Sequence, residues 1–251
     1  MQLAREPHVK VSVVIPSRLQ RHGDESLWLD RALRSIRGQT GLEGTAIEII
    51  VGLDPGAQPP QHDAVRFVHG RLAMQACAVN AAAAAATGDA LAFLEDDDLW
   101  EPKRLAYGLA VLGRYDVVTC NQREVSEDGT FVRINDFATP SGWLLPRSLW
   151  ARLGGLDESF RFHVDTEYLG RMNAAGVRRL HLLEAGAHGR PWIDNVARFS
   201  DLAHTSEPAP LVVRTVNSRG GMAQIAAGGE AGRRSQLEHQ WLQEKYGHVP
   251  W

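Results

Sequence analysis

The order of the apolar segments in the first hundred residues constrains the fold most. Four runs of strand length are rich in β-branched or other apolar residues, and they cover residues 10–15, 46–53, 65–68 and 90–94. Helical patterns occupy residues 27–39 and 72–87, and the second of them is rich in alanine and ends at Gly88. This β-α-β-β-α-β order predicts an α/β, Rossmann-like fold with a mainly parallel central sheet flanked by helices.

The second half of the chain is less regular. A hairpin turn is expected at residues 127–129 and a helix at 165–175, stopped by Gly176. A glycine-rich stretch, residues 220–232, precedes a terminal helix that we expect to cover residues 235–246. That helix is expected to pack through Leu237, Trp241 and Leu242.

Composition excludes several classes of protein. The net charge of −3 and the pI near 6.4 provide no positive field for DNA or RNA. Cys77 and Cys120 are too few and too far apart for a disulfide framework or a zinc site. No segment resembles a signal peptide or has the roughly 20 apolar residues of a transmembrane helix, so a cytoplasmic protein is expected.

The acidic run Glu95-Asp96-Asp97-Asp98 directly follows the fourth predicted strand. Adjacent carboxylates raise one another's pKa unless a cation neutralises them, and hard oxygen ligands suit Mg²⁺ or Mn²⁺ beside substrate phosphates. A solvated acidic turn is the alternative. Ligands of parallel sheets bind at the carboxyl ends of strands, which favours the metal site.

Four segments carry a resemblance to a known family: KVSVVIPSR, EIIVGLDPG, AAAAAATGDALAFLEDDDLWEPKRL and GGLDESFRFHVDTEYLGRMNAAG. They occur in the order seen in family 2 glycosyltransferases of the GT-A fold, and the chain resembles a soluble, bacterial-type member. The resemblance spans most of residues 10–176. It implies one continuous GT-A domain, with a nucleotide-sugar-binding half at residues 1–114 and an acceptor-binding half with the C-terminal helix at residues 115–251.

The resemblance also implies a set of nucleotide-binding residues. They are Pro16, Ser17, Arg18, Asp54, Asn80 and Asp96. A carboxylate such as that of Asp54 can accept the imide N–H of uracil. The alternative for Asp54 is a turn aspartate before proline, and for Asn80 a structural role.

The family's DxD motif aligns with Glu95-Asp96-Asp97. Asp97 would then bind the metal that bridges the donor diphosphate, and Glu95, a departure from the usual aspartate, is a second candidate ligand. His188 and His204 lie where many GT-A enzymes place a third metal ligand, although a lone histidine is more often a packing residue. For Asp98 the alternative is an N-cap of the helix near Pro102.

Asp165 matches the family's general base, which takes a proton from the acceptor hydroxyl in inverting members. Val164 precedes it where glutamate is usual, and Glu167 fills the following acidic position. The alternative for Asp165 is a helix cap. Trp143 and Glu167 are expected to bind the acceptor, Trp143 by stacking on a sugar ring, although core packing is the more common role of tryptophan.

The implied function is metal-dependent, inverting transfer of a single sugar from a nucleoside-diphosphate sugar, UDP being the expected nucleotide. The acceptor is a hydroxyl-bearing glycan, lipid-linked sugar or small molecule. A QxxRW-type motif of processive synthases is not found. Two alternatives remain open: a retaining GT-A enzyme, and a catalytically silent nucleotide-sugar-binding subunit, suggested by Val164 and Glu95.

Overall fold

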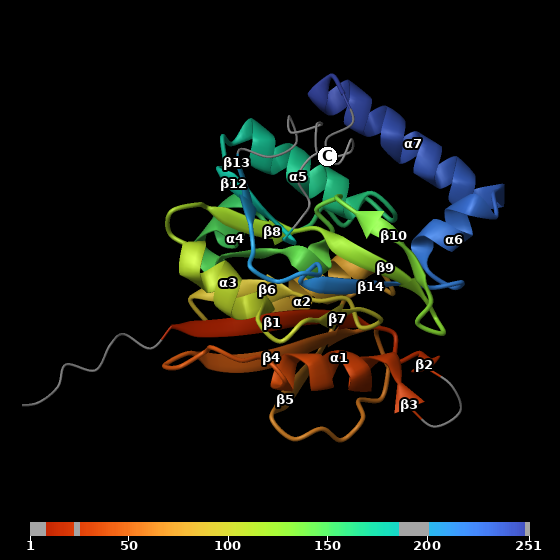
Figure 1. Cartoon of the computed structure of the whole chain (residues 1–251). Coiled ribbons are helices and arrows are strands. Elements are labelled where there is room, and N and C mark those ends of the chain that lie inside the picture. The colour runs from red at the N-terminus through yellow and green to blue at the C-terminus, as the bar shows by residue number, and fades with distance from the viewer. Residues whose placement is uncertain (1–8, 23–25, 186–200, 249–251) are drawn as a thin grey trace, which may run out of the picture.

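An eight-stranded sheet forms the centre of the computed structural model, which describes residues 9–22, 26–185 and 201–248 (Figure 1). Its strand order is β13-β12-β8-β11-β6-β1-β4-β5. The strands are β1 (Lys10–Ser17), β4 (Ala46–Leu53), β5 (Val65–His69), β6 (Ala90–Phe93), β8 (Val117–Cys120), β11 (Leu144–Pro146), β12 (Arg179–Leu183) and β13 (Asp201–His204). Only β11 runs antiparallel to its neighbours, so the predicted mainly parallel sheet is confirmed.

Helices cover both faces of this sheet, which explains why its strands are apolar on both sides. Along β1, Val13 belongs to the core beneath α1 (Trp28–Arg37) and α3 (Arg104–Val111). Val14 points to the other face and packs with α2 (Gln75–Ala84), α4 (Arg147–Leu153) and α5 (Val164–Ala174). The predicted helix–strand order of the first half is therefore observed, with helix ends shifted by a few residues.

A second sheet of four strands packs beside the carboxyl end of β6. Its order is β10 (Phe131–Asn135), β9 (Gln122–Ser126), β14 (Val212–Val216) and β7 (Leu99–Trp100). The hairpin turn predicted at residues 127–129 joins β9 to β10. Because β7 begins directly after the acidic run, that run bridges the two sheets, and strand β14, from late in the sequence, pairs with both β7 and β9.

Three short elements complete the structure. They are the strand pair β2 (Arg21–His22) and β3 (Ser26–Leu27) and the 3-10 helix η1 (Pro140–Gly142). At the C-terminal end, the glycine-rich stretch that precedes the predicted terminal helix is itself largely helical. It forms α6 (Gly221–Ala226) and the first turn of α7 (Gly229–Tyr246).

The predicted packing of the terminal helix is wrong for two of its three residues. Leu237 is 46% and Trp241 37% exposed, whereas Ser235, Glu238 and Leu242 are buried at helical spacing. The carboxylate of Glu238 accepts backbone N–H groups of residues 161–163, just before α5. A hydrophobic pattern could not reveal this contact, because a polar side chain makes it.

Candidate functional site

The acidic run lies at the carboxyl end of β6, between the two sheets. Glu95, Asp97 and Asp98 each offer one carboxylate oxygen, and these oxygens lie within 4.8 Å of one another. Three hard oxygen donors this close fit a divalent cation such as Mg²⁺ or Mn²⁺. The arrangement supports the metal interpretation of the run over a solvated turn.

Side chains from β1 and α2 hold Glu95 and Asp96, the first two acids of the run. The hydroxyl of Ser17, at the end of β1, donates to the Asp96 carboxylate over 2.5 Å. The side-chain amide of Gln75, at the start of α2, donates to Glu95. Pro16 lines a small cavity with Gln75 and Glu95. The structure thus brings the predicted residues of β1 and the run together.

The small sheet holds the second half of the run. Asp98 is 1% exposed and accepts hydrogen bonds from the Ser141 hydroxyl at 2.5 Å and from the Thr215 N–H at 2.9 Å. It does not cap a helix, since α3 begins at Arg104, so that alternative is wrong. Among the described residues, the side-chain partner of the Asp97 carboxylate is Asn217, and this hydrogen bond is long at 3.3 Å, so Asp97 is held less tightly than Asp98.

Burial of four adjacent acids disfavours their ionised forms. Burial, and next the charge of Asp97, raises the pKa of both Glu95 and Asp96 to about 7. Burial also raises the pKa of Asp97 and of Asp98. A divalent cation would restore the ionised forms, which is a second reason why these residues fit a metal.

These shifts predict an unusual pH dependence of stability for the metal-free protein. Between about pH 4.5 and about pH 7 the folded state binds more protons at Glu95 than the unfolded state, so the free energy of unfolding falls as pH rises. Below about pH 6.5 the lowered pKa of His163, about 4, acts in the opposite direction, so the test is thermal melting in EDTA from about pH 6.5 to about pH 8, where the midpoint should fall. Mn²⁺ should stabilise most at the alkaline end. A midpoint that rises over this range in EDTA would contradict the interpretation.

Asp165 faces the acidic run from the first turn of α5. It is partly buried, and its carboxylate accepts the Thr166 N–H at 2.8 Å. The N-cap of α5 is His163, so Asp165 does not occupy the capping position. Its charge contributes to the raised pKa of Glu95, and burial raises its own pKa. A carboxylate in this position can accept a proton beside the candidate metal site.

Trp143 is not available to an acceptor. Its side chain is fully buried, its indole N–H donates to the Ala138 carbonyl at 2.7 Å, and its ring stacks on Tyr168 at 5.4 Å between centroids. The expected stacking on a sugar is therefore corrected to core packing. The acceptor role was an expectation from the family resemblance, and the burial of the ring excludes it.

The structure also corrects the acceptor role of Glu167. This residue is fully buried, and its carboxylate accepts hydrogen bonds from Arg171, Lys245 and Tyr246, which fastens α7 to α5. Glu167 follows Asp165 by two positions in α5, and two positions correspond to about 200° of helical rotation, so the two side chains point in nearly opposite directions.

Asn80 has a structural role instead of the predicted nucleotide contact. Its side-chain amide donates to the Leu156 carbonyl at 2.9 Å, and its oxygen accepts the Leu156 N–H at 2.8 Å. It joins α2 to the turn after α4, and the amide also donates to Glu158 at 3.0 Å. This is the alternative that the sequence left open.

The two histidines do not join the candidate metal site in the described structure. His188 lies outside the described residues. His204 ends β13, four strand positions from β6, which corresponds to about 19 Å at the usual spacing. The expectation that His204 is a third metal ligand is therefore wrong.

Arg18 and Asp54 lie side by side at the edge that carries the run. Ser17 pairs with Leu53, so the residues after β1 and β4 leave the sheet together. Arg18 is exposed and Asp54 partly buried. Their place next to the run agrees with the nucleotide-binding role expected of them, which stays a prediction.

Several residues of this site were not found from the sequence. They are Gln75, Ser141, Arg214, Thr215 and Asn217. Only Arg214 had a usable signal, since a charged residue interrupts the apolar strand VVRTV. The other four are ordinary polar residues whose closeness to the run depends on the tertiary structure.

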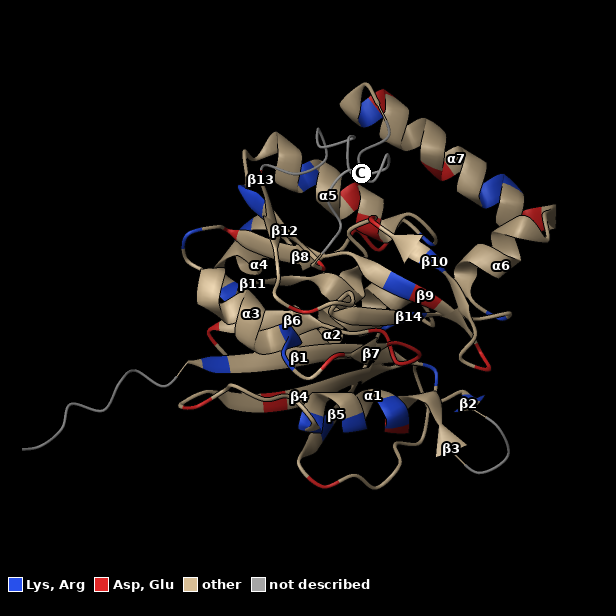
Figure 2. Cartoon of the chain, viewed as in Figure 1, with Lys and Arg blue, Asp and Glu red and all other residues tan. Residues whose placement is uncertain are grey.

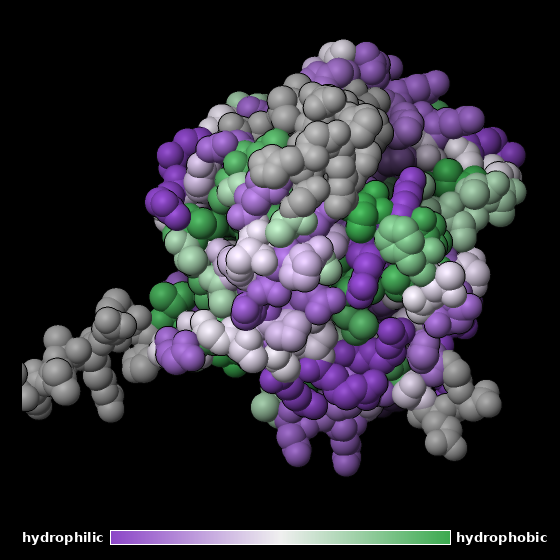
Figure 3. Space-filling model, in the orientation of Figure 1, coloured by the Kyte–Doolittle hydropathy of each residue, from purple (hydrophilic) through white to green (hydrophobic). Residues whose placement is uncertain are grey.

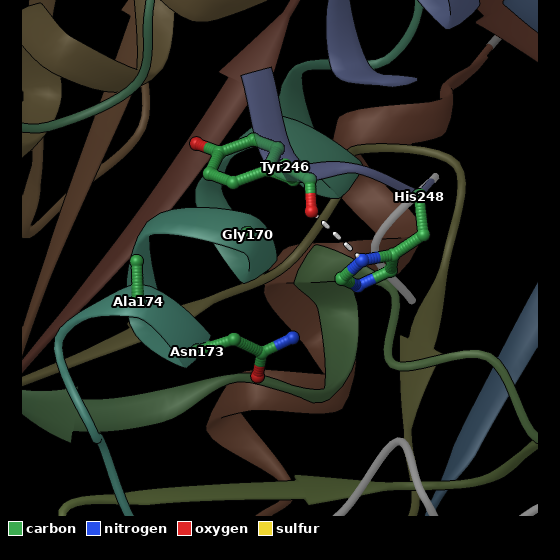
Figure 4. Close-up of a pocket in the computed structure, with 5 residues that line it drawn as sticks. All are labelled: Gly170, Asn173, Ala174, Tyr246 and His248. Carbon is green, nitrogen blue, oxygen red and sulfur yellow. Dashed lines mark hydrogen bonds between the residues drawn. The ribbon is translucent and has the colours of Figure 1, made fainter. Parts of the chain in front are cut away.

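A separate cavity of about 270 Å³ lies between α5 and the end of α7 (Figure 4). It is lined by Gly170, Asn173, Ala174, Tyr246 and His248. None of the predicted site residues lines it. The acidic run at the junction of the sheets is therefore the better candidate site.

The candidate site thus lies at the carboxyl ends of the strands of an open, mainly parallel sheet, where α/β proteins of this class bind their ligands. The profile of the family "Glycosyl transferase family 2" matches residues 12–166. The chain therefore belongs to this family of glycosyltransferases. A comparison with curated proteins finds no match.

Solved structures of S. aureus TarS share the fold. TarS 1–349 in complex with UDP has a TM-score of 0.57 and 14% identity, over 95% of this chain and 72% of that chain. TarS 1–349 in complex with UDP-GlcNAc has a TM-score of 0.56 and 14% identity, over 95% and 73%. A third TarS structure has a TM-score of 0.55 and 14% identity over 93% of this chain, but only 43% of that chain is covered. Among the described residues, no helix is both long and apolar enough to cross a membrane.

Proposed function

We propose that this glycosyltransferase moves one sugar from a UDP-sugar to an acceptor hydroxyl with inversion, using Mn²⁺ or Mg²⁺. The observation that carries the proposal is the cluster of Glu95, Asp97 and Asp98 oxygens within 4.8 Å, with Asp165 facing it. The similarity to TarS, whose structures contain UDP and UDP-GlcNAc, supports the choice of donor. Residues 1–114 would bind the donor and residues 115–251 the acceptor.

The position of each candidate residue in the sheet indicates which part of the donor it would bind. Asp54 and residues 16–18 would hold the nucleoside, since they lie at the carboxyl ends of β4 and of β1, and β1 is the strand next to β6. Asp97, with Glu95, would hold the cation, which when bound neutralises charge on the donor diphosphate.

Asp165 would accept the proton of the acceptor hydroxyl as its oxygen bonds to the anomeric carbon. The sugar–phosphate bond breaks on the opposite side of that carbon, and the nucleoside diphosphate leaves with the bonding electron pair. The anomeric configuration is thereby inverted.

A donor screen followed by product analysis tests the proposal. Thermal shifts with UDP, GDP and their sugars, each with Mn²⁺ or EDTA, should single out a uridine ligand in the presence of Mn²⁺. NMR of the product formed from that donor should show the inverted anomer. Retention would favour the retaining alternative, and a protein that binds UDP-sugars but neither transfers nor hydrolyses them would be the silent alternative.

Asp54→Ala is expected to weaken UDP binding by about tenfold or more, the effect of losing a hydrogen bond to a charged group. The affinity for Mn²⁺ alone should not change, because Asp54 follows β4 and not the acidic run. Calorimetry measures both constants, and Asp63→Ala, at an exposed position before β5, is a matched control. An unchanged UDP dissociation constant would leave Asp54 as a turn residue.

A further inference from the structure

A ladder of charged residues crosses the small sheet. Arg133 on β10 pairs with Glu124 on β9, and Glu124 pairs with Arg214 on β14. Directly paired residues of neighbouring strands share one face of a sheet, so the three side chains lie in a row. Figure 2 shows adjacent blue and red segments on β9 in this sheet.

One buried carboxylate holds both arginines. Glu124 is 2% exposed and accepts Arg133 Nε and an Arg214 guanidinium nitrogen, each at 2.6 Å. Asn135 donates to the same carboxylate at 2.6 Å. Because a guanidinium has five N–H donors, each arginine keeps donors beyond the one that Glu124 uses.

The two arginines differ in what else surrounds them. Burial opposes the charge of Arg214, but Asp98, Glu95 and Glu124 together raise its pKa, so this arginine is compensated by the acidic run. The side chain of Arg133 is 66% exposed and has no other carboxylate partner among the described residues. The outer end of the ladder therefore presents a positive charge to solvent.

The ladder connects the proposed catalytic centre to the surface. The charge of Arg214 acts on both Glu95 and Asp165. Arg133 lies two strand positions further out, which is about 10 Å at the usual spacing. Figure 3 shows hydrophilic side chains between hydrophobic ones over β9 and β10.

We propose that Arg133, oriented by Glu124, binds an anionic group, a phosphate or a carboxylate, of the acceptor whose hydroxyl reacts beside Asp165. The inference rests on the proposed function and adds the chemical class of the acceptor. A guanidinium fixed through its Nε presents its two outer nitrogens in the fork geometry that matches phosphate and carboxylate oxygens.

The test compares two small probes that differ by one phosphate. Calorimetry with glycerol 3-phosphate and with glycerol is done on the protein saturated with UDP and Mn²⁺, and repeated without nucleotide. Wild type should bind glycerol 3-phosphate at least tenfold more tightly than glycerol. Arg133→Gln should lower the affinity for glycerol 3-phosphate at least tenfold and leave the UDP affinity unchanged, and Arg133→Lys should lie between.

Arg123→Gln is the matched control. Arg123 neighbours Glu124 on β9 but points to the opposite face, where it pairs with Glu101 at 3.6 Å. This variant should bind both probes as wild type does. A melting midpoint of Arg133→Gln equal to that of Arg123→Gln shows that any loss is not caused by unfolding.

Three results would overturn the proposal. Wild type and Arg133→Gln could bind glycerol 3-phosphate equally well, or wild type could bind glycerol as tightly as glycerol 3-phosphate. The third is displacement of UDP by glycerol 3-phosphate. Glycerate in the same titration separates the two anions, and Arg133-dependent binding of either one supports the subsite. Failure of wild type to bind UDP would contradict the proposed function instead, and the titrations without nucleotide would still decide the role of Arg133.

Discussion

Asp165→Asn is expected to lower the turnover number by about 10² to 10⁴-fold, the usual contribution of a general base. Asparagine keeps the shape of the side chain and its oxygen can still accept the Thr166 N–H, but it cannot take a proton. UDP affinity and the melting midpoint should therefore stay at wild-type values. Single-turnover kinetics at saturating donor and acceptor separate this loss from binding.

Glu167→Gln, two residues further along α5, is the informative comparison. Its carboxylate joins α5 to Lys245 and Tyr246 of α7, so this change should lower the melting midpoint and leave the turnover of the folded enzyme intact. If Asp165→Asn turned over at near the wild-type rate, Asp165 would not be the base and a retaining mechanism would gain support. Glu167 would not replace it, because that carboxylate is fully buried in the ion-pair cluster.

Asp97→Ala is expected to remove the metal dependence of UDP binding. In wild type, Mn²⁺ should tighten UDP binding by about 10- to 100-fold relative to EDTA. This is the size of effect that is typical when the interactions of a metal site are disrupted. Asp97 is held less tightly than Asp98, so it is the more available of the two to a cation. Calorimetry of UDP in Mn²⁺ and in EDTA measures the factor for both proteins.

Asp98→Ala provides the contrast. Asp98 is buried, and its carboxylate accepts hydrogen bonds from the Ser141 hydroxyl and the Thr215 N–H. Removing the carboxylate leaves both donors without this partner. That variant should melt at a lower temperature than Asp97→Ala, which should keep the wild-type midpoint in EDTA. Equal UDP affinity of wild type in EDTA and in Mn²⁺ would show that the run binds no catalytic metal.

The sequence alone predicted the central sheet because its signals are local. Residues 46–53 are apolar except for Glu48, as expected of a strand that is largely buried on both faces. The position of the acidic run at the end of β6 followed from the same logic, since residues after a parallel strand emerge at the ligand-binding edge. Local order therefore determined both the fold class and the place of the site.

The second sheet and the terminal helix depended on contacts between distant residues. Strand β14 pairs with β7 across more than a hundred residues of sequence. Nothing in the local sequence around Val212 or Trp100 indicates that these two residues pair. The docking of α7 relies on Glu238, a charged residue that helical hydrophobic periodicity assigns to solvent. Pattern rules fail there because a buried polar contact replaces an apolar one.

The roles of individual side chains divided in the same way. The resemblance to family 2 glycosyltransferases identified Asp97 and Asp165 as candidates, because both match acidic positions of the family's motifs. Only the tertiary structure decided that Trp143 is core and that Asn80 and Glu167 fasten helices, since burial and the identity of the hydrogen-bond partner are set by residues far away in the chain. A side chain that can serve both chemistry and packing takes its role from its neighbours, and the folded chain alone supplies them.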